Sequence, residues 1–142
     1  MRRFKFNLEK ILQLRKFKEE ECKLALGQAI SALNIIENEI KETAVKRHSA
    51  ASMRFVDVGE TLSWERYIAR LDQQAKQLTE KAAQAEMVVE EKRALYLEAS
   101  KDLKAIEKLK EKQKKEHRKE VMDYEIAQVD DLTAARRFVN QE

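Results

Sequence analysis

Residues 64–106 read WERYIARLDQQAKQLTEKAAQAEMVVEEKRALYLEASKDLKAI, and apolar side chains recur along them in alternating steps of four and three. This spacing is typical of an α-helix that packs lengthwise against another helix in a coiled coil. Only Lys92 interrupts the apolar series. The series, called here the helix-two seam, consists of Trp64, Ile68, Leu71, Ala75, Leu78, Ala82, Ala85, Val89, Lys92, Tyr96, Ala99, Leu103 and Ile106.

A second series with the same spacing, the helix-one seam, consists of Cys22, Leu26, Ala29, Leu33, Ile36 and Ile40. Between the two series the pattern weakens at residues 49–52, and Asp57-Val58-Gly59 supplies turn-forming residues. The chain therefore carries both halves of a helical hairpin. We predict an all-α fold, a long antiparallel two-helix coiled coil with unequal arms.

The predicted fold is a single coiled-coil domain over residues 1–142. Helix one is expected over about 6–48, the connecting loop over about 49–62 and helix two over about 63–138. The hydroxyl of Thr61 or Ser63 is expected to cap helix two by accepting a hydrogen bond from a free backbone N–H group of its first turn.

The composition favours long helices over a globular core. The chain has no Pro and two Gly, 39% of its residues are charged and 6% are aromatic. No stretch approaches the roughly 18 apolar residues of a membrane span, and the basic N-terminus lacks the apolar segment of a secretion signal. We therefore expect a cytoplasmic protein whose single cysteine, Cys22, is a buried seam residue.

The predicted arms differ in length, and the seam pattern changes where the shorter arm ends. Antiparallel pairing with the bounds above places the chain start beside Ile106. Residues from about Glu107 onward are then predicted to overhang without an intrachain partner. The seam positions after Ile106 are polar, namely Lys110, Gln113, His117 and Glu120.

Positive charge gathers in the two segments that this pairing brings together. Residues 1–18 have a net charge of +6 and residues 101–120 of +4, whereas the whole chain has +3. The remaining shaft and the C-terminal tail are therefore mildly acidic. One interpretation is a solvated helix laced with i,i+4 ion pairs along residues 108–115. The other is a basic end that enters an acidic ring or meets an acidic surface.

No catalytic pattern is found in the sequence. His48 and His117 are the only histidines, are predicted to lie far apart, and have no Cys or second His at the spacing of metal ligands. There is no Gly-rich phosphate loop, and the aromatic residues Trp64 and Tyr96 occupy seam positions. We predict a protein that is not an enzyme and that holds no metal and no cofactor.

Three stretches of the sequence stand out in a fixed order, namely FNLEKILQLR at residues 6–15, Gly59 followed by WERYIARL at residues 64–71, and AIEKLKEKQ at residues 105–113. Together they resemble the FliJ family of bacterial flagellar export proteins. The resemblance covers nearly the whole chain. The order and spacing of the three stretches make it more specific than any one of them alone.

This resemblance implies a stalk-like component of the flagellar type III export apparatus. Members of the family insert one end of an antiparallel coiled coil in the hexameric ring of the export ATPase and promote its assembly. They also bind the cytoplasmic linker of the export gate protein, couple the ATPase to that gate, and escort export chaperones. The resemblance thus implies these three partners, no nucleic acid, and a place at the cytoplasmic face of the inner membrane that is reached through partners only.

The charge pattern and the resemblance together indicate two sets of contact residues. For the export ATPase we expect Arg2, Arg3, Phe4, Phe6, Lys10, Arg15, Lys108, Leu109, Lys110, Lys112 and Lys115. The gate-contact stripe of the family maps onto Tyr67, Leu71, Gln74 and Leu78 of helix two and onto Glu39, Thr43 and Lys46 of helix one. The helix-one residues are polar, where other members would present apolar groups. Leu71 and Leu78 are also seam residues, so Tyr67, one step off the seam, is the better exposed contact.

Two other functional interpretations fit the same features of the sequence. A stalk of a virulence type III secretion system or of a rotary ATPase would have the same rod, basic end and ring partner, so the identity of the partner separates it. A generic coiled-coil adaptor or a nucleic-acid-binding rod would use the Lys-rich residues 108–115. The interleaved acids Glu107, Glu111, Glu116 and Glu120 count against nucleic acid, because they would oppose phosphate.

Overall fold

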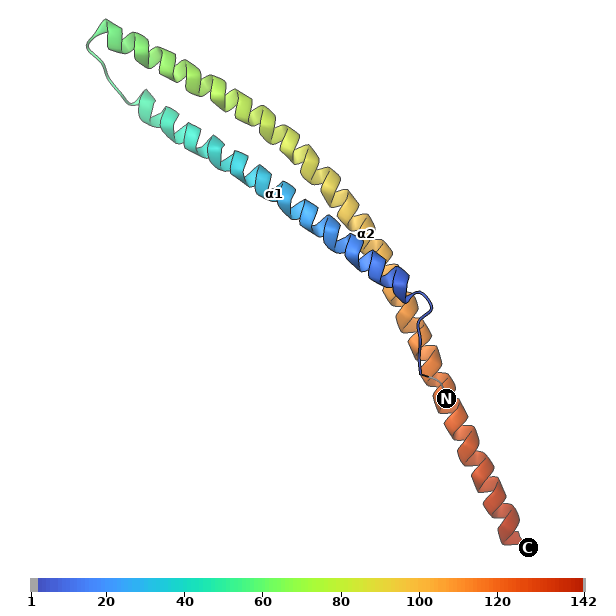
Figure 1. The fold of residues 1–142 in the computed structure, drawn as a ribbon. Helices are drawn as coiled ribbons and strands as arrows, with labels where there is room; N and C mark the ends of the chain where they lie inside the picture. The colour runs from blue at the N-terminus through green and yellow to red at the C-terminus, as the bar shows by residue number, and fades with distance from the viewer. Residues whose placement is uncertain (1–2, 142) are drawn as a thin grey trace. The chain divides into compact units, whose positions relative to one another are not determined.

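Two long helices account for most of residues 3–141, the part of the chain that the structure describes. In this computed structural model, α1 comprises Glu9–Ala51 and α2 comprises Val58–Gln141 (Figure 1). The described residues contain no strand. The predicted all-α fold of two long helices is therefore confirmed.

The chain divides into two compact units. The hairpin unit is Glu19–Glu98, and the terminal unit combines Met1–Lys18 with Ala99–Glu142. The terminal unit thus joins the two segments in which the sequence gathers positive charge.

In the hairpin unit, the two helices run antiparallel and are joined by residues 52–57 (Figure 1). The seam residues of both helices are buried or half-buried, and Leu71, Leu78 and Val89 are only 4–5% exposed. Burial of these apolar side chains is the main favourable term for holding two such helices together. The heptad spacing therefore correctly selects the side of each helix that faces the other.

The loop of the hairpin is shorter than the sequence suggests. We expected helix one to end near residue 48 and helix two to begin near residue 63, whereas α1 ends at Ala51 and α2 begins at Val58. The last turn of α1 is closed by hydrogen bonds from the backbone N–H of Ser52 to the carbonyl of Ser49 (3.3 Å) and from Met53 to Ala50 (3.1 Å). These bonds satisfy carbonyls that a helix end otherwise leaves unpaired.

Asp57 caps α2, so the expected cap at Thr61 or Ser63 was wrong. The Asp57 carboxylate accepts a hydrogen bond from the backbone N–H of Gly59 at 3.3 Å. The Thr61 hydroxyl instead donates to the Asp57 carbonyl at 2.9 Å. Aspartate is as effective an N-cap as serine or threonine, and because it comes earlier in the chain, the helix starts earlier.

In the terminal unit, residues 3–8 precede the helix and pack along α2. We expected helix one to start near Phe6, whereas α1 starts at Glu9. Phe6, Leu12 and Ile106 form a buried core, with Leu12 only 1% exposed. The partly buried side chains packed against this core are Phe4, Leu8, Leu103 and Leu109.

We expected the overhang of helix two to start near Glu107, and this start was wrong because residues beyond Glu107 still contact the rest of the terminal unit. Leu109 packs against the core, Lys110 binds Glu9, and the ring of His117 lies 5.7 Å from that of Phe4. A residue outside a helix can span roughly 3.3–3.6 Å, against about 1.5 Å in a helix. The non-helical N-terminal segment therefore reaches farther along α2 than a continued helix would.

The exposed end of α2 begins later, at Met122. Every described side chain from Met122 to Asn140 is exposed. In Figure 1 this stretch, drawn in red, continues past the N-terminal segment of the same unit. An overhang exists, but it is confined to the last turns of α2.

Candidate protein-interaction surfaces

The positive surface of the terminal unit contains most of the residues expected to bind the ATPase. Arg3, Lys10, Lys108, Lys112 and Lys115 are exposed there, and all five belong to the same compact unit. Their side chains come from the N-terminal segment, the first turn of α1 and the middle of α2. Arg2 lies outside the described residues.

Two further cations of this set make contacts within the chain. The Arg15 guanidinium donates a hydrogen bond to the Asp102 carbonyl at 2.9 Å, and the Lys110 ammonium lies 3.0 Å from the Glu9 carboxylate. The hydrogen bond from Lys110, helped by one from Gln13, lowers the pKa of Glu9 below its ordinary value. Arg15 and Lys110 thus fasten the start of α1 to α2.

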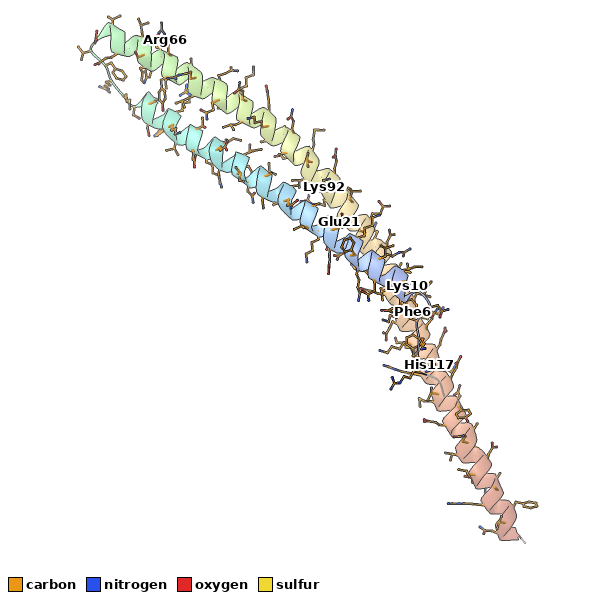
Figure 2. The ribbon with its side chains drawn as sticks, in the orientation of Figure 1. Phe6, Lys10, Glu21, Arg66, Lys92 and His117 are labelled. Carbon is orange, nitrogen blue, oxygen red and sulfur yellow. The ribbon has the colours of Figure 1, made fainter. Side chains whose placement is uncertain are left out.

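The apolar residues of the same set belong to the core of the terminal unit. Phe6 is 8% exposed, and Phe4 and Leu109 pack against the core that it helps to form. Figure 2 labels Phe6 beside α2, and the Lys110 ammonium lies 6.0 Å from the centre of its ring. This distance is compatible with a cation–π contact. Phe6 is thus buried in the core of the terminal unit, whereas Phe4 and Leu109 keep part of their side chains exposed.

A groove separates the N-terminal segment from α2. Arg3, Phe4, His117 and Glu120 are among the residues that line it. Phe4 and His117 meet there with their ring planes at 44°. Because the groove holds charges of both signs, it adds little to the positive surface itself.

Of the seven residues expected to contact the gate, four are exposed on the hairpin unit and three are buried within it. Tyr67, Gln74, Glu39 and Lys46 are exposed. Tyr67 and Gln74 lie one heptad apart on α2, as do Glu39 and Lys46 on α1, so each pair shares one face of its helix. The Arg70 guanidinium lies 5.9 Å from the centre of the Tyr67 ring.

The remaining three gate residues are buried within the hairpin. Leu71, Leu78 and Thr43 are each 4% exposed, and the Thr43 hydroxyl donates a hydrogen bond to the Glu39 carbonyl at 2.8 Å. Packing between the two helices therefore explains why both leucines are buried. Their side chains hold the two helices together and are not available on the surface.

An ion pair ties the helices together near this set. The Arg47 guanidinium donates to the Asp72 carboxylate at 2.6 Å, with about half of each side chain exposed. The hydrogen bond to Asp72 raises the pKa of Arg47 above its ordinary value. This pair joins α1 to α2 close to Lys46 and Leu71.

An apolar surface at the loop was missed in the sequence. Met53 is 54% exposed, Phe55 37%, Leu62 51%, and Val56 and Val58 even more. The ring of Phe55 lies 6.3 Å from that of Trp64, and a shallow groove there extends to Tyr67. The available signal was that four of the six residues from Met53 to Val58 are large and apolar, inside a predicted loop where polar residues are more usual. We call these residues, with Tyr67, the loop surface.

Neither unit offers a metal centre in the part of the chain that is described. Among residues 3–141 no group of three or more His, Cys, Asp or Glu side chains is placed to hold a metal ion. In the same range no helix has the length and apolar character needed to cross a membrane.

Comparison with known proteins points to one family. A family model described as "Flagellar FliJ protein" matches residues 4–142, which is nearly the whole chain and includes all three stretches that carried the resemblance. No curated protein and no solved structure matches the chain at the significance that we required.

Proposed function

The chain belongs to the FliJ family and is therefore a component of the flagellar type III export apparatus; from this premise we propose that it is a stalk that links the export ATPase to the export gate. In the proposed arrangement, the terminal unit enters the hexameric ring of the ATPase and promotes its assembly. The hairpin unit carries the contact with the gate.

The positive surface of the terminal unit is the observation that best supports this proposal. Residues 1–18 and 101–120, with net charges of +6 and +4, belong to one compact unit. Arg3, Lys10 and Lys108 are exposed in it. A concentrated positive surface attracts an acidic partner and orients its approach.

The proposed role is mechanical rather than catalytic. Two antiparallel helices cannot present the same side chains to six identical subunits. A ring that holds such a stalk therefore contains inequivalent subunits, and their nucleotide states can be coupled to the position of the stalk. Seam packing supplies the stiffness that such coupling needs.

For the gate, the proposed contact combines Tyr67 and Gln74 with the neighbouring loop surface. Tyr67 has an exposed edge beside apolar groups, a combination common in protein interfaces. Leu71 and Leu78 support this contact from inside the hairpin. The polar residues Glu39 and Lys46 would form its rim.

The remaining proposed roles follow from the family and involve the same apparatus. We expect the chain to escort export chaperones. We also place it in the cytoplasm, at the cytoplasmic face of the inner membrane, where it is held only through its partners.

Charge reversal of the terminal unit tests the proposal. A variant with Lys108→Glu, Lys112→Glu and Lys115→Glu is expected to lose most of its stimulation of the cognate flagellar export ATPase. Its helical content should stay unchanged because all three side chains are exposed. Circular dichroism and ATP hydrolysis are measured on the same samples.

A matched control makes the same change in charge on the hairpin unit. Lys41, Lys76 and Lys81 are also exposed, and their reversal to Glu should leave stimulation intact. Equal stimulation by the two triple variants would exclude the positive surface as the ATPase contact. Repeating the assay with a virulence ATPase tests the related-machine alternative, which requires preference for that enzyme.

A further inference from the structure

The exposed end of α2 has an apolar stripe of its own. Met122, Val129, Leu132 and Val139 are 60–68% exposed, and Ile126 beside them is 55% exposed. No hairpin partner covers them, because all described side chains from residue 122 to 140 are exposed. Large apolar side chains aligned on one helix face are typical of an interaction surface.

These residues form a coiled-coil series that is independent of the hairpin. Alternating steps of three and four connect Met122, Glu125, Val129, Leu132, Arg136 and Val139, here called the tail seam. The helix-two seam, continued from Ile106, would instead pass through Glu120 and Tyr124. At about 100° per residue, the two series lie on different sides of α2. The tail seam is thus a series of its own and does not continue the helix-two seam.

The tail seam is symmetric about its own centre. Antiparallel alignment with a second copy places Met122 opposite Val139 of that copy and Val129 opposite its Leu132. All four apolar residues therefore meet apolar residues. Such pairing of each a position with a d position is how antiparallel coiled coils form their layers. Two-fold symmetry is also the commonest way for identical chains to associate.

Charge complementarity favours the same alignment. The two charged members of the tail seam, Glu125 and Arg136, fall opposite each other, so one dimer contains two such pairs. A parallel alignment would instead set Glu125 against Glu125 and Arg136 against Arg136. The acids Asp123, Asp130 and Asp131 lie more than about 100° around the helix from the centre of the seam. They therefore point away from the second copy and oppose association only weakly.

We propose that two copies of this chain associate reversibly through an antiparallel pairing of their tail seams. The paired stretch, residues 122–139, is on the order of 27 Å long, so the dimer is expected to be weak and to depend on concentration. While paired, residues 122–139 are covered and unavailable to other proteins. This inference does not depend on the proposed contact with the ATPase.

Charge substitutions in the full-length chain test the pairing by analytical ultracentrifugation. Glu125→Arg alone, or Arg136→Glu alone, places like charges opposite each other and should weaken self-association at least about tenfold. An equal mixture of the two variants restores opposite charges in both pairs and should associate like the native chain. Asp131→Arg is the matched control, since it changes the net charge equally on the other side of the helix, and it should not weaken association.

Two results would overturn the proposal. One is a native chain that stays monomeric at every concentration. The other is an equal loss of association in Glu125→Arg and Asp131→Arg. Because all described side chains of the tail, residues 122–140, are exposed, circular dichroism should show unchanged helical content for each variant.

Disulfide formation between introduced cysteines tests independently whether the two tail seams pair antiparallel or parallel. In a Cys22→Ala background, a mixture of Met122→Cys and Val139→Cys chains should form a mixed disulfide under mild oxidation. Either variant alone should not, because antiparallel copies would hold their two cysteines on the order of 25 Å apart. Cross-linking of each variant with itself would indicate a parallel dimer and would refute the proposed register.

Discussion

The indole Nε1 of Trp64 donates a hydrogen bond to the backbone carbonyl of Ala50 at 2.6 Å. Ala50 is 1% exposed and lies in the last turn of α1, where helix carbonyls lack intrahelical partners. One side chain from α2 thus both packs at the end of the helix-two seam and gives the Ala50 carbonyl a second donor beside the backbone N–H of Met53. The hairpin is closed by this contact as well as by its loop.

Trp64→Phe should lower the stability of the hairpin. It keeps an aromatic ring but removes one of the two donors to the Ala50 carbonyl, which keeps its hydrogen bond from the backbone N–H of Met53. The free energy of unfolding should therefore fall by about 0.5–1.5 kcal/mol, the net contribution of one hydrogen bond. Thermal unfolding followed by circular dichroism measures the change. Tyr67→Phe, which removes a hydroxyl from an exposed ring, is the control and should match the native chain. Native stability in Trp64→Phe would show that the bond contributes nothing.

Leu12 is expected to hold the terminal unit together. Leu12→Ala leaves a cavity in the core and should cost about 2–5 kcal/mol. Hydrogen exchange should show lost protection in residues 9–18 and 99–113. Leu14→Ala is the matched control two residues away, since Leu14 is 66% exposed and its truncation should change little. Equal protection in both variants would argue against a packed core.

The contact between Glu9 and Lys110 should stabilise the chain only while Glu9 is ionised. The folded-state pKa of Glu9 lies below its ordinary value of 4.5. The contribution is therefore complete above that value and is lost as the pH falls through the lower folded pKa. Glu9→Gln should melt slightly below the native chain at pH 7 and together with it in strong acid. A difference that persists in strong acid would mean that the charge is not responsible.

Removal of residues 122–142 should leave the rest of the chain as stable as before. The described part of this stretch is exposed throughout, so no packing within the chain is lost. Thermal unfolding of the truncated protein should keep its midpoint, while its total helical signal falls. A lower midpoint in dilute protein would reveal a contact of the tail with its own chain.

The periodicity of apolar residues predicted the hairpin well, because the residues on the buried face of a helix recur at regular spacing in the sequence. The positions of the helix-two seam, from Trp64 to Ile106, are buried or half-buried. Helix ends were less predictable, since Asp57, Thr61 and Ser63 can each cap a helix. The choice depends on where the loop can close, and this is a property of the folded hairpin.

Two features of the surfaces could not be read from the helical pattern. The N-terminal segment packs without a helix, so the phase of the heptads gave no sign that Phe6 would be buried and that Lys110 would meet Glu9. The tail seam follows a different series from the helix-two seam. When the helix-two seam is continued past Ile106 through His117 and Glu120, its positions hold only polar residues. Both cases involve packing that the repeat of the hairpin does not encode.

Tyr67 and Leu71 should separate binding from stability. Tyr67 is 36% exposed, whereas Leu71, one turn away, is 4% exposed. Tyr67→Ala should therefore weaken binding to the cytoplasmic linker of the gate protein at least tenfold, as is common for an aromatic anchor, and leave the hairpin folded. Leu71→Ala should instead cost about 2–5 kcal/mol of stability. Calorimetric titration with the linker and thermal unfolding measure the two effects.

Val88→Ala, a truncation of another exposed apolar residue on α2, is the control for loss of surface area and should change neither quantity much. If Tyr67→Ala binds the linker like the native chain while remaining folded, the gate contact lies elsewhere. The loop surface would then have to be tested separately, through Phe55→Ala. A loss of binding that appears only together with a loss of stability would mean that the linker recognises the packed hairpin as a whole and not the exposed edge of one ring.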